Sequence, residues 1–218
     1  MCIRDWSGSD ASYMRTFAKR EGDHYIINGT KNWVTNGISC DIVLLMCLTE
    51  KEVGHKGIST FIIEKGLKGF STGKKEDKLG IRGTDTCELY FEDCKVPVEN
   101  LLGDEGGGFT IALGTLDGGR IGISTQDLGI AKESLDLSVY YANERKQFGK
   151  SIGEFQLMQG KIADMYTTTN ACRAYVYAVA AACDRGETTR KDAAGCILYS
   201  AEKATQVSLE AIQSLGGN

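Results

Sequence analysis

The sequence is poor in several residue types, and each shortage argues against a class of protein. It has two histidines among 218 residues, and its eight cysteines form no Cys-x-x-Cys pair, so we expect no metal site and a reducing compartment. No apolar run approaches the roughly 20 residues that span a bilayer, and no apolar signal-peptide core follows the N-terminus. The net charge of −4 gives no reason to expect nucleic acid or a membrane as a partner.

The motifs of enzymes that carry their own reacting groups are also missing. There is no Gly-x-Ser-x-Gly and no histidine placed for a triad. Residues 106–108, all glycine, complete neither a P-loop nor a dinucleotide fingerprint. The Ser-x-x-Lys matches at 71–74 and 200–203 lack the companion motifs of acyl-transfer enzymes. The sequence therefore predicts that a bound cofactor supplies the chemistry, or that there is none.

The composition changes near residue 100. Before it, short β-branched runs at 41–48, 58–63 and 86–92 alternate with polar and glycine-rich segments. The dipeptide Asn28-Gly29 lies between two such runs and predicts a hairpin. Four or five strands without intervening helices predict an antiparallel β domain over residues 1–100.

After residue 108 the apolar residues recur at helical spacing. Three long helices are predicted, at 108 to about 145, from the capping box of Ser151 and Glu154 to about 184, and from Thr189 to Leu215. Residues 101–218 thus form most of a four-helix bundle, with an apolar stripe left uncovered. The fold class is α+β: an antiparallel β domain followed by an incomplete helical bundle.

The first of these helices is rich in glycine. Gly114, Gly118, Gly119, Gly122 and Gly129 each cost about 1 kcal/mol relative to alanine in a helix interior. Such a run is tolerated only where a ligand or a packed helix comes close, so it indicates a missing partner.

Two candidate binding groups lie in the first half of the chain, and each has a plainer explanation. Trp33, with Val34 and Thr35 beside it, could offer a flat wall and a hydroxyl to a heteroaromatic ring, or it could be a core tryptophan. Ser9 could contact a phosphate or a carbonyl, or belong to an ordinary turn.

Two more candidates lie in the helical half. We expect Arg145 to be buried. It could bind a pyrophosphate through two parallel hydrogen bonds, or pair with Glu144 or a neighbouring carboxylate. Asp117 and Arg120 place opposite charges one turn apart on the glycine-rich face, where a plain ion pair is the alternative.

In their order along the chain these motifs resemble those of acyl-CoA dehydrogenases. The matching segments are 8–10, 31–37, 78–83, 91–97, 145–149, 155–156 and 213–217. The resemblance covers nearly the whole chain after Trp6, and residues 155–167 and 197–218 look most like isovaleryl-CoA and related short- or branched-chain dehydrogenases, with butyryl-CoA dehydrogenase among them. It implies a middle β domain and most of the C-terminal four-helix bundle, without the family's N-terminal helical domain.

The resemblance also implies FAD as the cofactor. Trp33, Val34 and Thr35 would lie against the flavin ring, and Ser9 would contact the flavin or the thioester region of acyl-CoA. Asp117, Gly118, Gly119 and Arg120 would line the acyl-CoA channel. The pyrophosphate and adenosine of FAD would be held by residues of the bundle, namely Arg145, Phe148, Gln156, Gln213, Leu215, Gly216 and Gly217. In the family these last residues reach a flavin of the neighbouring subunit, so we expect a homotetramer built as a dimer of dimers.

The implied activity is α,β-desaturation of a short- or branched-chain acyl-CoA, as in fatty acid β-oxidation or branched-chain amino acid catabolism. Electrons would pass to an electron-transfer flavoprotein, in a bacterial cytoplasm or a mitochondrial matrix. Two alternatives stay open: an oxidase-like flavoprotein of the same superfamily, and a non-catalytic helical bundle that serves assembly.

The family removes the α-proton of its substrate with a glutamate. Isovaleryl-type enzymes carry it at the position equivalent to Gly119, and most relatives carry it in a Tyr-Glu-Gly segment that would lie beyond Asn218. We therefore expect no catalytic base within these residues and an inactive isolated chain. Residues 3–6 stand where the family usually has Thr-Glu-Pro-Gly, so we expect residues 1 to about 6 not to be native to the fold.

Overall fold

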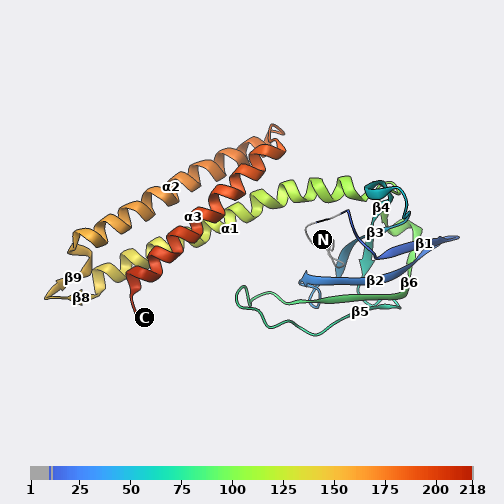
Figure 1. Cartoon of the computed structure of the whole chain (residues 1–218), viewed down its shortest axis with the longest axis horizontal. Coiled ribbons are helices and arrows are strands. Elements are labelled where there is room, and N and C mark those ends of the chain that lie inside the picture. Colours follow the sequence, from blue (N-terminus) through green and yellow to red (C-terminus); the bar gives the residue numbers. More distant parts are fainter. Residues whose placement is uncertain (1–9, 11, 218) are drawn as a thin grey trace. The chain divides into compact units, whose positions relative to one another are not determined.

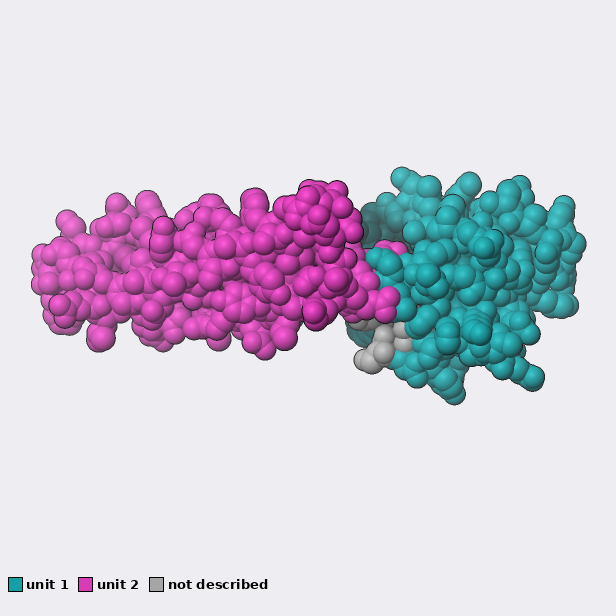
Figure 2. All heavy atoms as spheres, turned by 90° about the horizontal axis from the view of Figure 1, so that it is seen from above, with its two compact units in different colours: residues 1–114 teal, residues 115–218 magenta. Residues whose placement is uncertain are grey.

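The computed structural model describes residues 10 and 12–217, which belong to two compact units (Figure 1, Figure 2). Unit 1 covers residues 1–114 and contains the sheet, and unit 2 covers residues 115–218 and is helical. The predicted fold class, a β domain followed by a helical domain with three long helices, is confirmed.

The described part of unit 1 forms a seven-stranded sheet in the order β5-β6-β2-β1-β3-β4-β7. One detail of the expectation is wrong, because β1 and β3 pair in parallel and the sheet is therefore mixed. The chain folds back from β1 into β2 and then crosses to the other side of β1, so β3 again runs in the direction of β1. The strands are β1 (Phe17–Glu21), β2 (His24–Thr35), β3 (Ile42–Leu48), β4 (Ile58–Glu64), β5 (Phe70–Thr72), β6 (Thr86–Pro97) and β7 (Leu101–Leu102), with 3-10 turns η1 (Gly54–Gly57) and η2 (Val98–Asn100).

The hairpin predicted at Asn28-Gly29 is wrong, since β2 runs through both residues. The register of β2 against β6 shifts between Ile27 and Gly29. At this irregularity the Asn28 amide donates to a carboxylate oxygen of Asp93 (3.0 Å), and the Asp93 backbone N–H donates to the Asn28 carbonyl oxygen (2.8 Å). The turn of the β1–β2 hairpin contains Gly22 instead, which has a left-handed φ of 66°. The dipeptide thus stabilises a bulge rather than a turn.

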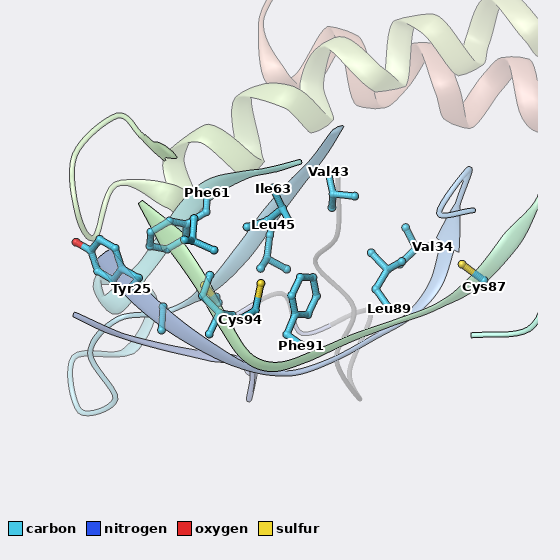
Figure 3. Close-up of a cluster of buried hydrophobic side chains, with 14 residues drawn as sticks. Tyr25, Val34, Val43, Leu45, Phe61, Ile63, Cys87, Leu89, Phe91 and Cys94 are labelled. Carbon is cyan, nitrogen blue, oxygen red and sulfur yellow. The ribbon is translucent and has the colours of Figure 1, made fainter. Parts of the chain in front are cut away.

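The larger of the two buried apolar clusters described in unit 1 packs on one face of this sheet (Figure 3). Tyr25 and Phe61 meet edge to face with ring centroids 4.8 Å apart, and Phe70 stacks on Phe91 at 5.1 Å. Such aromatic pairs add to the stabilisation from burial alone. Cys47, Cys87 and Cys94 are buried among these rings and aliphatic chains, where they pack as small apolar residues.

The glycine run at 106–108 fixes the start of helix α1 (Gly108–Glu144) against the sheet. The Gly106 N–H donates to the Ser59 hydroxyl (2.9 Å). Glu105, the residue before Gly106, accepts a hydrogen bond from the Tyr25 hydroxyl (2.9 Å). A Cβ on Gly108 would lie 2.7 Å from the Ser59 carbonyl carbon. Close backbone approach therefore explains a motif that completes no nucleotide fingerprint.

Unit 2 contains the rest of α1, then β8 (Lys146–Gln147), β9 (Lys150–Ser151), η3 (Ile152–Glu154), α2 (Gln156–Asp184) and α3 (Arg190–Leu215). The capping box of Ser151 and Glu154 is present, but it caps η3. Helix α2 begins only after Phe155, whose backbone is extended. A second capping box, of Thr189 and Asp192, caps α3, which begins where the sequence predicts. None of the helices in the described ranges is long and apolar enough to cross a membrane.

Helices α1 and α3 run parallel with one constant offset. Three side-chain hydrogen bonds between described residues of the two helices join residues 73, 73 and 74 positions apart. The pairs are Asp117 with Arg190, Asp127 with Ser200, and Ser134 with Ser208. Beside the last two pairs lies an apolar cluster that α2 completes, formed by Ala131, Leu135, Met165, Ala204, Val207 and Ala211.

We expect opposite effects from the same substitution at two glycines of α1. Gly108→Ala should lower the free energy of unfolding of unit 1 by about 1–3 kcal/mol, because its methyl group overpacks the backbone of β4. Gly129→Ala should raise stability by about 1 kcal/mol, because no described atom outside its own helix turn lies within 4 Å of the added Cβ. Urea unfolding of the 218-residue chain measures both. Equal stabilities would contradict the close approach at Gly108.

The stability of the chain should fall as the pH rises above about 8.5, the ordinary pKa of a thiol. Burial raises the pKa of the Cys87, Cys94 and Cys172 thiols. The pKa of Tyr25 is raised mainly by burial and also by its hydrogen bond to Glu105. The unfolded chain therefore loses these protons at a lower pH than the folded chain, so raising the pH favours unfolding.

Urea midpoints at pH 7 and pH 9.5 test this expectation. Cys172→Ala should make the decline shallower, whereas Cys183→Ala, at an exposed cysteine, should leave it unchanged. A midpoint that does not change with pH would refute it.

Candidate functional site

Trp33 occupies a bulge of β2 that leaves its ring largely exposed. Lys31 faces Leu89 and Val34 faces Cys87, so two residues of β2 oppose one residue of β6. Trp33 itself has a left-handed φ of 55°, and it is 59% exposed. The interpretation of Trp33 as a core tryptophan is therefore wrong.

The neighbours of Trp33 divide between surface and core. Thr35 is exposed, whereas the Val34 side chain is buried in the core, so only its backbone is available to a ligand on this surface. A left-handed backbone costs a non-glycine residue of order 1–2 kcal/mol, and such strain gathers at functional positions. An exposed indole beside a hydroxyl suits a flat heteroaromatic ring. Ser9, the remaining predicted contact of this group, lies outside the described residues.

A cavity of about 360 Å³ lies in unit 2, where the end of α1 meets the end of α3. It is lined by Tyr141, Arg145, Gln147, Ile152, Ser214, Leu215, Gly216 and Gly217. Arg145 is exposed, so the expectation of a buried arginine is wrong. The ion pairs of the described residues do not include one between Arg145 and Glu144.

The cavity brings together four of the seven bundle residues that the resemblance implies for FAD. Gln156 is the first residue of α2 and Gln213 lies near the end of α3; both are exposed and neither lines the cavity. Phe148 stands at the β8–β9 turn, 93% exposed, with its ring edge-on to Phe155 at 6.1 Å. Sequence analysis missed Tyr141, Gln147, Ile152 and Ser214; only the place of Tyr141, one helical turn before Arg145, was a usable signal.

The surface around Trp33 and the cavity of unit 2 both have the chemistry that FAD requires. An arginine presents a rigid fork of donors to a diphosphate, and Gly216 and Gly217 leave room beside it because they have no side chains. The exposed Trp33 ring supplies an apolar wall of the kind a flavin ring needs. The residues therefore fit two parts of the cofactor: Trp33 fits the flavin ring, and Arg145 with the two glycines fits the diphosphate.

Asp117 carries a network of two ion pairs. One of its carboxylate oxygens accepts from Arg120 Nη1 at 2.6 Å, and the other accepts from Arg190 Nε at 3.1 Å. The intrahelical pair was the plain alternative for Asp117 and Arg120, and it is present. Arg190 comes from α3, and no local pattern in the sequence signals its contact with Asp117.

Gly118 and Gly119 lie exposed on α1 beside this network. A Cβ on either would meet no described atom within 4 Å beyond the helix's own nearby backbone, and the same holds for Gly114, Gly122 and Gly129. No described neighbour therefore requires these five positions to be glycine.

Apolar side chains on the helices of unit 2 are uncovered, as the sequence predicts. Ile123, Ile130 and Leu137 recur every seven residues along α1 and are 48%, 46% and 49% exposed. A groove of about 700 Å³ between α1 and α2 is lined in part by Leu135 and Ile162. Apolar surface of this extent indicates contact with further protein.

The chain matches two domains of one protein family. Residues 5–94 match the acyl-CoA dehydrogenase middle domain, and residues 106–218 match the acyl-CoA dehydrogenase C-terminal domain. The mitochondrial isovaleryl-CoA dehydrogenase of Oryza sativa subsp. japonica is 51% identical over 212 residues, which are 97% of this chain and 52% of the relative. The chain therefore spans about half the length of this curated relative.

Solved structures agree in fold. Butyryl-CoA dehydrogenase from Megasphaera elsdenii superposes with a TM-score of 0.96 at 44% identity, covering 99% of this chain and 57% of the other. A chain solved in work on the electron-transferring flavoprotein of Acidaminococcus fermentans gives a TM-score of 0.97 at 46% identity, with 99% and 57% covered. The family expected from the motifs is confirmed: this chain belongs to the acyl-CoA dehydrogenases and carries residues of their middle and C-terminal domains.

Proposed function

We propose that the chain is part of an FAD-dependent acyl-CoA dehydrogenase that desaturates short- or branched-chain acyl-CoA thioesters between Cα and Cβ. The observation that carries this proposal is Trp33, whose backbone is left-handed and whose ring is exposed, in a chain of this family. The named relatives act on isovaleryl-CoA and butyryl-CoA, which supports a short or branched acyl group without choosing between them.

Members of the family depend on FAD, which supplies the hydride acceptor when bound. In our proposal Trp33 and Thr35 lie against the flavin ring with the Val34 backbone, and Ser9 reaches the flavin or the thioester. The Arg145 guanidinium binds the pyrophosphate. The remaining contacts to the nucleotide come from Phe148, Gln156, Gln213, Leu215, Gly216 and Gly217. The cavity in unit 2 and the charge of Arg145 support this assignment.

We assign the acyl-CoA channel to the surface of α1 around Asp117. Asp117 and Arg120 offer it charged hydrogen-bonding groups, and Gly118 and Gly119 keep the helix surface free of side chains. The open space at both glycines supports this assignment, because alanine would otherwise be the better helix residue.

None of the described residues is proposed as the catalytic base. A glycine stands at position 119, where isovaleryl-type enzymes carry their glutamate, so the base of the complete protein would lie beyond Asn218. The 218-residue chain would then bind FAD weakly and lack desaturase activity.

We also propose a homotetramer, a dimer of dimers, as the functional assembly. The uncovered apolar residues of α1 support further protein contacts. The likeness to a chain from work on an electron-transferring flavoprotein supports such a protein as the electron acceptor. A mitochondrial relative is compatible with a mitochondrial matrix, and a bacterial cytoplasm is the other proposed location. We place the domain boundary near residue 100, between the two family matches.

The activity test compares the 218-residue chain with the same polypeptide extended by its natural coding sequence to the length of its relatives. The extended protein should be purified yellow and desaturate butyryl-CoA or isovaleryl-CoA with electron-transferring flavoprotein as acceptor. The 218-residue chain should do neither. Turnover by the 218-residue chain would refute the position of the base, and a colourless extended protein that FAD cannot reconstitute would refute the proposal. Rapid reoxidation of the reduced protein by air would instead identify an oxidase.

Arg145→Met in the extended protein should weaken FAD binding about 10–100-fold, because a charge-assisted hydrogen bond contributes about 1.5–3 kcal/mol. Arg145→Lys should restore part of this affinity by returning the charge without the fork. Arg185→Met serves as control, because it removes the same charge from an exposed pair with Glu187. Quenching of flavin fluorescence measures the affinity. An unchanged affinity in Arg145→Met would exclude Arg145 from the cofactor site.

A further inference from the structure

We propose that Arg190 is a positioning residue of the acyl-CoA site: it holds the Asp117 carboxylate in the orientation in which that carboxylate fixes Arg120. This inference rests on the proposed function, which places Asp117 and Arg120 at the acyl-CoA channel.

The two carboxylate oxygens of Asp117 have different partners. Arg120, one turn further along α1, binds Oδ1, and Arg190, the first residue of α3, binds Oδ2. A turn of the carboxylate about its own bond would break both hydrogen bonds. With Arg120 alone, Asp117 would belong to a partly exposed pair of neighbouring residues, and such pairs hold their geometry weakly.

The backbone of Arg190 is itself fixed. Thr189 immediately before it is the N-cap of α3, and its hydroxyl and backbone N–H exchange hydrogen bonds with Asp192. The guanidinium therefore approaches Asp117 from a defined helix end, although its side chain is 64% exposed. Asp117 is only 28% exposed, and Arg190 contacts it from α3.

The orientation of Asp117 matters because it controls Arg120. A guanidinium is planar, and one hydrogen bond from Nη1 to a fixed carboxylate limits the directions of its other donors. Arg120 is 33% exposed, so those donors can reach a ligand at the surface of α1. The charges do not cancel, because two arginines against one carboxylate leave a net positive charge, which favours a ligand that carries phosphates, such as acyl-CoA.

The polar contacts between α1 and α3 provide a matched control. Ser200 donates to Asp127 at 3.1 Å with the same offset along the two helices, but this contact lies further along both helices. Ser200 is buried, so its loss should affect the packing of α1 on α3 at least as much as the loss of the exposed Arg190. A purely structural role of Arg190 would therefore make the two variants alike.

The experiment uses the extended protein with FAD and measures kcat and KM for butyryl-CoA, together with the dissociation constant of its non-reacting thioether analogue by calorimetry. Arg190→Met should raise KM and the dissociation constant about 3–10-fold and leave kcat within about twofold, as expected for an interaction equally strong in the ground and transition states. Arg190→Lys should recover part of the loss. Ser200→Ala should lower the urea midpoint with KM unchanged, and Arg185→Met should change neither.

An unchanged KM and dissociation constant in Arg190→Met would overturn the inference while leaving the proposed function intact. Equal increases in Arg190→Met and Ser200→Ala would also overturn it, because helix packing alone would then explain the effect. Absence of turnover in the unaltered protein would overturn the proposed function, and a loss confined to Arg190→Met cannot be confused with that outcome.

Discussion

The constant register between α1 and α3 is the constraint on which the helical unit depends. Three hydrogen-bonded pairs at offsets of 73 and 74 residues hold two parallel helices that are far apart in sequence. Tyr141 and Ser214 are separated by the same offset, and both line the cavity that contains Arg145 and the terminal glycines. At the opposite end this offset separates Asp117 from Arg190. One helix register thus assembles both candidate sites of unit 2, the cavity beside Arg145 at one end and the charged network around Asp117 at the other.

Unit 1 presents its candidate site by a different means, a local irregularity in a long strand. In a regular pairing of β2 with β6, side chains would alternate between core and surface along the whole strand. The extra residue at positions 32 and 33 breaks the alternation, and the left-handed backbone of Trp33 leaves a large ring in solvent. The pairing of Lys31 with Leu89 and of Val34 with Cys87, and the burial of Val34 in the core, hold the backbone on both sides of Trp33. The left-handed backbone of Trp33 can persist because the strand pairing on both sides of it is regular.

The glycines and the exposed apolar residues of α1 are the features that unit 2 does not explain by itself. No described neighbour requires glycine at the five helical positions, and the aliphatic side chains at every seventh position of α1 remain about half exposed. Each would lower the stability or solubility of a solitary bundle. A ligand along the glycine face and further protein over the aliphatic face would remove both costs, as the proposed function requires.

Local patterns determined much of this protein from the sequence alone: the change from strands to helices near residue 100, the three helices and the start of α3 at Thr189. These features follow from contacts between near neighbours in the chain, which is what a local pattern records. The family followed from the resemblance of its ordered motifs. The sequence misplaced the first hairpin because Asn28-Gly29 suits a bulge as well as a turn. It also could not show that Trp33 is exposed, that Tyr141 and Ser214 share a cavity, or that Arg190 completes the pair of Asp117 and Arg120. Only the tertiary structure decided these points, because pairing across a sheet and between parallel helices brings together residues whose separation in the chain carries no local signal.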